Sequence, residues 1–166
     1  MDKIVYHGSS KFFKIALPKL NKRMKKGKII WKEVSFHATP NRYIALTYLQ
    51  NKKAKFSYKG KKYYFGTGIS LYKKDNIIEI YGINSLEYSL RKIFLDNKTK
   101  YLYLFDKKDF TYQKGLGKLE VVSLKRIKPL KVIRIKDPVK WIKKEKVRFK
   151  FTDITKIKRE MNFWKA

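Results

Sequence analysis

The segment Tyr6-His7-Gly8-Ser9 places an imidazole beside a glycine, a combination that can hold a ligand. The apolar residues before His7 predict a strand, and the Gly8-Ser9-Ser10 run predicts the turn that ends it. Because glycine has no side chain, a ligand can approach its backbone closely, and the N–H and C=O of Gly8 can bind a planar amide. The alternative interpretation is an ordinary histidine at a strand end.

A second candidate segment is Phe36-His37-Ala38-Thr39-Pro40, which leads into a predicted helix with Arg42, Tyr43 and Tyr48. Small residues beside the start of a helix are typical of a pocket wall that accepts an anion, because the first helical N–H groups lack partners. The alternative interpretation is a normal joint between a strand and a helix, with the aromatic side chains in the core.

A third candidate is Glu120, which follows the Gly115-Leu116-Gly117 turn and precedes the β-branched run Val121-Val122-Ser123. Acidic residues are scarce, with 13 in 166 residues, so an acid at the start of a predicted strand is a candidate for chemistry. The alternative interpretation is a surface carboxylate paired with one of the many lysines.

The composition excludes several other kinds of chemistry. The chain has no cysteine, which excludes disulfides, cysteine-based zinc sites and thiol nucleophiles. His7 and His37 are the two histidines, so a metal site would need carboxylates as well. We predict no metal.

The predicted strands are short and numerous. The alternation of Val34, Phe36 and Ala38 with polar residues is typical of a half-buried strand. Similar apolar or β-branched runs predict strands over residues 3–7, 34–39, 56–58, 63–65, 69–72, 77–81, 101–105, 119–123 and 130–135. Residues 59–62 predict a hairpin turn. The basic segment Lys19–Lys28 has no apolar period and predicts a mobile loop.

Four helices are predicted from their start signals. Thr39 is expected to cap the first, with Pro40 in its first turn. The run Asn84-Ser85-Leu86-Glu87 resembles a capping box and predicts a helix to Leu95. Asp137-Pro138 predicts a short helix. A last helix is expected to begin near Thr152-Asp153, with four apolar residues on one face: Ile154, Ile157, Met161 and Trp164.

Many strands and few helices, without regular alternation, predict an α+β fold with a mixed, mostly antiparallel sheet. The length fits one domain, and no internal repeat or Pro/Ser-rich linker divides the chain.

The charge predicts a polyanionic partner. Lys and Arg together number 43, which gives a net charge of +30. Only seven of the 43 are Arg, so contacts with a phosphate backbone are expected rather than sequence reading. Nucleic acid, bound with tolerance for sequence, is the expected partner. The alternative is a lysine-biased proteome, although such proteomes usually enrich Glu as well. The candidate contact residues lie in the basic segment: Lys22, Arg23, Lys25, Lys26 and Lys28.

The chain carries no recognisable targeting or membrane segment. Residues 1–10 lack the apolar stretch of a signal peptide. No run approaches the roughly 20 apolar residues of a membrane span. We therefore expect a cytoplasmic protein, or one that acts inside a host cell if it is viral, and no membrane partner.

In their order, the three candidate segments resemble the motifs of the ADP-ribosyltransferase fold, in the His-Tyr-Glu branch that includes the poly(ADP-ribose) polymerases. The matching stretches are YHGS (Tyr6–Ser9), FHATPNRYIA (Phe36–Ala45) and LEVVS (Leu119–Ser123), and Gly68–Glu79 resembles the central strand and loop. The resemblance spans about the first 135 residues. It implies a split sheet with flanking helices, an ADP-ribosyltransferase-like core over 1–136 and a C-terminal helical extension over 137–166.

The resemblance also implies roles for single residues, with NAD as the substrate. His7 would bind the nicotinamide-side ribose with support from Ser9, and Gly8 would hold the carboxamide. Glu120 would stabilise the positive charge that develops as the glycosidic bond breaks. Rings that would stack on the nicotinamide are Phe36, Tyr43 and Tyr48.

The sequence departs from the family pattern at one position. Spacing from Ala38 puts the middle Tyr of the motif on Phe36, which can stack on a ring but lacks the hydroxyl. This puts full catalytic competence in doubt. His37 is either a substitute polar group or a solvent-facing residue, and we favour the second.

The leading hypothesis joins charge and motifs: an NAD-dependent ADP-ribosyltransferase that modifies a nucleic acid or a nucleic-acid-bound target. The main alternative is a non-catalytic, basic nucleic-acid-binding protein of the same fold. A transferase that moves a 2′-phosphate from RNA to NAD would need several arginines in one cleft, and the seven here are dispersed. Binding to a membrane surface through residues 152–164 is the weakest alternative.

Overall fold

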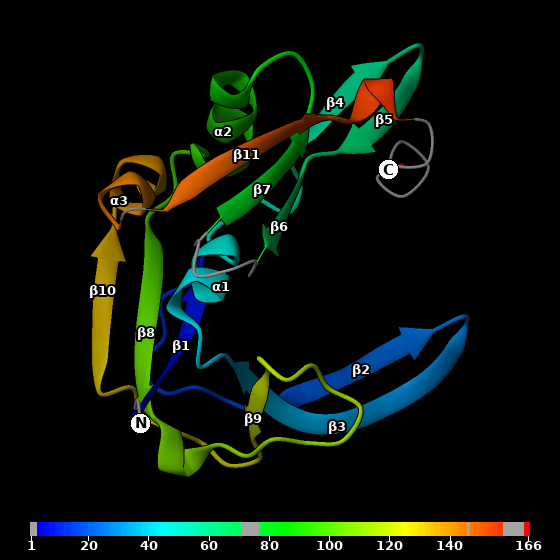
Figure 1. The fold of residues 1–166 in the computed structure, drawn as a ribbon. Coiled ribbons are helices and arrows are strands. Elements are labelled where there is room, and N and C mark those ends of the chain that lie inside the picture. The colour runs from blue at the N-terminus through cyan, green and yellow to red at the C-terminus, as the bar shows by residue number, and fades with distance from the viewer. Residues whose placement is uncertain (1–2, 71–76, 146, 158–164) are drawn as a thin grey trace.

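The computed structural model describes residues 3–70, 77–145, 147–157 and 165–166. These residues form an α+β fold, because short helices pack on sheets that are mostly antiparallel. Figure 1 shows the sheets arranged around an opening, with the β2–β3 hairpin projecting on one side of it and the β4–β5 hairpin on the other.

The central sheet has the order β1-β8-β10, with all neighbours antiparallel. A second sheet has the order β11-β7-β6, in which β11 runs parallel to β7. A third has the order β2-β3-β9, and β4 pairs with β5 alone. The strands are β1 (Ile4–Ser9), β2 (Lys19–Lys25), β3 (Lys28–Ala38), β4 (Lys55–Tyr58), β5 (Lys61–Tyr64), β6 (Gly66–Ser70), β7 (Ile77–Gly82), β8 (Lys100–Asp106), β9 (Val121–Ser123), β10 (Lys131–Ile135) and β11 (Arg148–Asp153).

The helices within the described residues are α1 (Arg42–Thr47), α2 (Leu86–Phe94) and α3 (Pro138–Lys144), with 3-10 turns at Lys107–Asp109 and Ile154–Lys156. None of them is long and apolar enough to cross a membrane.

Two clusters of buried side chains hold the elements together. The larger joins α1, α2, α3 and the β6–β7 region, with Leu46, Ile80 and Phe94 among its members. The smaller lies beneath β1, β8 and β9 and includes Val5 and Phe105. Strand β8 contributes to both clusters, with Leu102 in the larger and Phe105 in the smaller.

The basic segment Lys19–Lys28 is not a loop, and the prediction was wrong here. It forms β2, the turn and the first residue of β3, with a two-residue turn at Lys26 and Gly27, where φ is 47° and 76°. Positive φ at both turn positions matches the twist of a hairpin. The apolar period was missing because most side chains of β2 are exposed.

Two helix caps differ from the predictions. Asn41, not Thr39, caps α1, since its side chain accepts bonds from the N–H groups of Tyr43 and Ile44. Ser85 caps α2, and Glu87 pairs with Arg91 instead of closing a capping box. The short helix after Asp137 is confirmed.

The carboxyl-terminal part also differs. Thr152 and Asp153 end strand β11, which was not predicted, rather than starting a helix. Ile154 begins a 3-10 turn, while Met161 and Trp164 lie outside the described residues, as does part of the predicted strand 69–72. Because α3 packs in the larger cluster and β11 pairs with β7, residues 138–157 belong to the main body rather than to a helical extension.

Candidate active-site cleft

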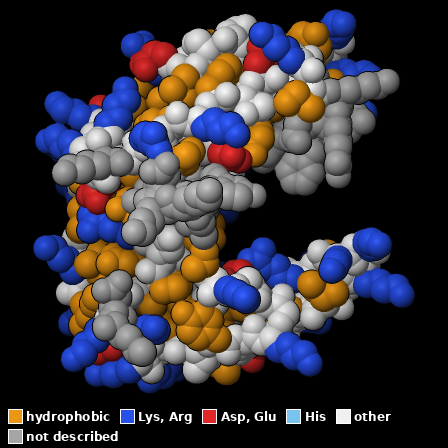
Figure 2. Space-filling model, viewed as in Figure 1, with side chains coloured by type: hydrophobic (Ala, Val, Ile, Leu, Met, Phe, Trp, Pro, Cys, Tyr) orange, Lys and Arg blue, Asp and Glu red, His pale blue; other side chains and the backbone are white. Residues whose placement is uncertain are grey.

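His7 and Glu120 line one cleft, with a volume of about 820 Å³. This size is in the range of small-molecule sites. Its walls come from the end of β1, the β2–β3 hairpin, the end of α1 and the turn before β9. Figure 2 shows the molecule deeply hollowed between the β2–β3 hairpin and the part that carries β4 and β5.

A backbone bridge brings the first two candidate segments together. Tyr6 and Thr39 exchange N–H···O bonds of 2.8 and 2.9 Å, so the end of β3 lies against β1. Strand β9 pairs with β3 on its other side, with His37 opposite Val122. The turn before β9 therefore places Glu120 beside His37.

The His7 imidazole is fixed in one tautomer. Its Nδ1 lies 2.8 Å from the carbonyl oxygen of His37, so Nδ1 donates and Nε2 keeps its lone pair. Burial is the largest cause that lowers the pKa of His7, the bond to the carbonyl partly opposes it, the nearby Lys52 adds to it, and the net pKa is about 4. His7 is thus neutral at pH 7, and its Nε2 can accept a hydrogen bond from a ligand hydroxyl.

The low pKa of His7 makes the free energy of unfolding depend on pH. Between pH 6.5 and 4 the unfolded chain binds a proton that the folded chain does not, so this stability is present above pH 6.5 and is lost as pH falls. We expect a loss of about 2–3 kcal/mol from this group between pH 7.5 and 4.5. Urea unfolding of the wild type and His7→Gln at both pH values measures it. An equal pH dependence in both proteins would contradict the assignment.

Gly8 lies within β1 rather than in a turn, which corrects the predicted strand end. A Cβ at Gly8 would lie 2.1 Å from the carbonyl oxygen of Ala45 in α1. The absence of a side chain is therefore required by the packing of α1 on β1, whether or not a ligand binds. Ser9 also lines the cleft, and its Oγ accepts a bond from the Lys11 N–H.

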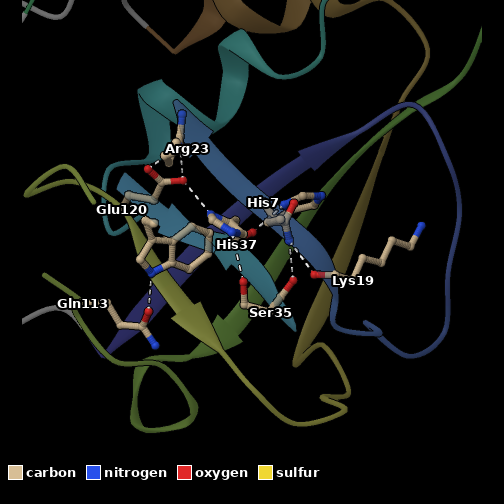
Figure 3. Close-up of polar contacts among 9 residues, drawn as sticks. His7, Lys19, Arg23, Ser35, His37, Gln113 and Glu120 are labelled. Carbon is tan, nitrogen blue, oxygen red and sulfur yellow. Dashed lines mark hydrogen bonds and ion pairs between the residues drawn. The ribbon is translucent and has the colours of Figure 1, made fainter. Parts of the chain in front are cut away.

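Glu120 is held by two side chains (Figure 3). The Nη2 of Arg23 lies 2.5 Å from each carboxylate oxygen, and the Nδ1 of His37 lies 2.6 Å from Oε1. Burial raises the pKa of Glu120, but the bonds from His37 and Arg23 outweigh it, and the pKa lies below its usual range. Glu120 is therefore a carboxylate at neutral pH, in a cleft where its charge is partly shielded from water.

His37 points into the cleft, contrary to the favoured prediction that it faces solvent. Its Nδ1 donates to Glu120, and its Nε2 lies 3.1 Å from the Oγ of Ser35. Trp31 packs edge-on against the ring. The order Ser35-His37-Glu120 resembles the relay of a serine hydrolase. However, Ser35 is only 1% exposed, so it orients His37 and cannot attack a substrate.

The predicted stacking rings separate into two groups. Tyr48 lines the cleft, where burial and the nearby Glu120 raise its pKa, with Arg23 opposing them. Phe36 is partly buried and packs instead against the smaller core cluster, with its ring centroid 4.6 Å from that of His7 and 5.4 Å from that of Phe105. Tyr43 packs against the larger cluster. Neither Phe36 nor Tyr43 is among the residues that line the cleft.

The predicted basic residues are also divided. Lys22 and Arg23 line the cleft, whereas Lys25, Lys26 and Lys28 lie at the hairpin tip, outside its lining. Sequence reasoning missed five further lysines of the cleft, because they come from separate loops and from the start of β8: Lys11, Lys52, Lys53, Lys98 and Lys100. Lys100 is fully buried and bonds to Asp96 at 2.7 Å. These lysines make the cleft attractive to an anion.

The residues of the cleft give little support to 2′-phosphate transfer or to a metal site. Among the described lining residues Arg23 is the single arginine, so the arginine set expected for 2′-phosphate transfer is not there. In the described part of the chain, no cluster of three or more His, Asp or Glu residues could hold a metal ion.

No protein-family model matches the chain, and neither a curated protein nor a solved structure is significantly similar to it.

Proposed function

We propose that this protein is an NAD-dependent ADP-ribosyltransferase that acts on a nucleic acid or a nucleic-acid-bound target. The observation that carries the proposal is that His7 and Glu120, 113 positions apart in the sequence, line a single cleft. A neutral hydrogen-bond acceptor and a carboxylate in one cleft are the groups that a sugar and a developing cation need.

In the proposed reaction, the bond between the ribose C1′ and the nicotinamide nitrogen breaks, and its electron pair leaves with nicotinamide. The positive charge that develops on the sugar is stabilised by the Glu120 carboxylate, which His37 and Arg23 orient. A nucleophilic atom of the acceptor then bonds to C1′ and loses its proton to Glu120 or to water.

The other cleft residues suit the rest of NAD. The lone pair on Nε2 of His7 would accept a bond from a ribose hydroxyl. Tyr48 offers a ring for stacking, and the lysines of the cleft would offset the charge of the pyrophosphate. Phe36 packs against the smaller core cluster and does not line the cleft, so we expect no stacking contribution from it.

The proposal is tested by incubating the protein with NAD labelled in its adenylate half, together with duplex DNA, RNA or protein acceptors. We expect release of free nicotinamide and transfer of the label to one class of acceptor. Nicotinamide release without transfer would indicate hydrolysis only. Absence of both with every acceptor would contradict the proposal.

One observation favours a second candidate, a non-catalytic nucleic-acid-binding protein. Arg23 contacts both oxygens of Glu120, so the carboxylate is already neutralised by an ion pair. The two candidates differ in whether NAD binds. Protection by NAD against thermal unfolding supports the transferase, whereas an unchanged melting temperature in millimolar NAD favours the non-catalytic protein.

A further inference from the structure

The β2–β3 hairpin forms a two-stranded ribbon that projects from the molecule beside the cleft (Figure 1). Strand β2 is the outer strand of its sheet, and β9 covers only the far end of β3, at Phe36–Ala38. The rest of the ribbon carries mostly exposed side chains on both strands. A ribbon of this kind is a shape that can enter a groove.

Apolar side chains lie on the ribbon in cross-strand pairs. Leu20, which is 64% exposed, pairs with Val34, which is 54% exposed. Met24 pairs with Ile29, and each of these two side chains is 53% exposed. A lysine pair, Lys22 and Lys32, lies between them in the register. Paired apolar side chains that stay exposed on a projecting element are typical of a surface that a partner covers.

The positive charge of the ribbon indicates a polyanionic partner. Residues 19–35 contain seven Lys and Arg and a single acid, Glu33. Alternating cations and apolar groups fit a nucleic acid, because the cations can reach phosphates while apolar side chains contact thymine methyls and sugar edges. The major groove of B-form DNA admits a two-stranded ribbon, whereas that of an A-form duplex is too deep and narrow.

The position of the ribbon relates it to the cleft. Asn21, Arg23 and Trp31 lie in the middle of the ribbon and line the cleft, and Arg23 also bonds Glu120. We infer that the β2–β3 ribbon docks duplex DNA by inserting into its groove, next to the cleft. The naming of duplex DNA as the acceptor rests on the proposed transferase function, whereas the docking itself does not.

The experiment measures binding of fluorescent 20-base-pair DNA by anisotropy at several salt concentrations, without NAD. Lys25→Gln/Lys28→Gln removes the lysine pair at the tip. We expect about tenfold weaker binding and a salt slope reduced by about two. The matched control, Lys131→Gln/Lys136→Gln, removes the same charge from β10 and the residue that follows it, on another side of the molecule, and is expected to change affinity little. Equal losses in both variants would overturn the inference, because binding would follow net charge alone.

A second variant, Met24→Ser/Ile29→Ser, tests the apolar pair. We expect severalfold weaker binding with an unchanged salt slope, because apolar contacts release no counterions. Single-stranded DNA and duplex RNA serve as further probes and should bind less tightly than duplex DNA. Unchanged DNA affinity together with conversion of a dimer to a monomer in sedimentation would overturn the inference, since the pair would then contact a second copy. Nicotinamide release is assayed separately, so loss of docking and loss of transferase activity are distinguished.

Discussion

Glu120→Gln is expected to lower the rate of nicotinamide release from NAD by about 10²–10³-fold. The amide has nearly the same shape as the carboxylate but no charge, so it cannot stabilise the cation that develops on the ribose. In the proposed reaction Glu120 acts on the developing cation, whereas other cleft residues would bind NAD in its ground state. We therefore expect the affinity for NAD and for DNA to change little. Measuring kcat and KM from nicotinamide release, with calorimetry for NAD binding, separates the two effects.

The matched control for this variant is Glu87→Gln. Glu87 lies on α2 and pairs with Arg91 across an exposed helix surface. The change of charge is the same, but Glu87 is not among the residues that line the cleft. We expect wild-type turnover. Turnover that is retained in Glu120→Gln, or lost equally in both variants, would remove Glu120 from the mechanism.

Gly8→Ala is expected to cost about 3 kcal/mol of folding free energy, at the upper end of the range for overpacked sites. The added Cβ would meet the carbonyl oxygen of Ala45 at 2.1 Å. This atom belongs to the backbone of α1, so the whole helix must shift from β1. For a chain of this length the melting temperature should fall by roughly 6–12 °C.

Gly117→Ala is the matched control, because a Cβ at Gly117 would have no neighbour within 4 Å. Thermal unfolding of both variants should show a large fall for Gly8→Ala and almost none for Gly117→Ala. If Gly8→Ala keeps its melting temperature but loses NAD binding, Gly8 serves the ligand and not the packing. This outcome would contradict the structural explanation for the glycine.

Local patterns predicted the elements whose signals lie within a few residues. The hairpin at residues 56–65 and the helix after Asp137 were found because turn and cap residues act over short distances. The β2–β3 ribbon was missed because both of its faces are exposed, so its side chains show no apolar alternation. The remaining local indication of a hairpin is the turn at Lys26 and Gly27.

The position of His37 in the cleft was within reach of sequence reasoning. Residues two apart in a strand share a face, so Ser35 and His37 lie opposite to Phe36. The structure packs Phe36 against the smaller core cluster, and His37 on the opposite face of the strand lines the cleft. The family motif had directed attention to Phe36. Its ring was expected in the cofactor site because a motif gives spacing but not the side of the strand that the ligand occupies.

The sequence by itself determined the α+β class, the basic character and the three segments able to do chemistry, because composition and local spacing are properties of the chain alone. Only the tertiary structure decided that His7, His37 and Glu120 line one cleft. Their approach depends on the bridge between Tyr6 and Thr39 and on the pairing of β9 with β3. Such pairings join residues 33 to 87 positions apart, and their free energy comes from burying the shared core, which no local pattern records.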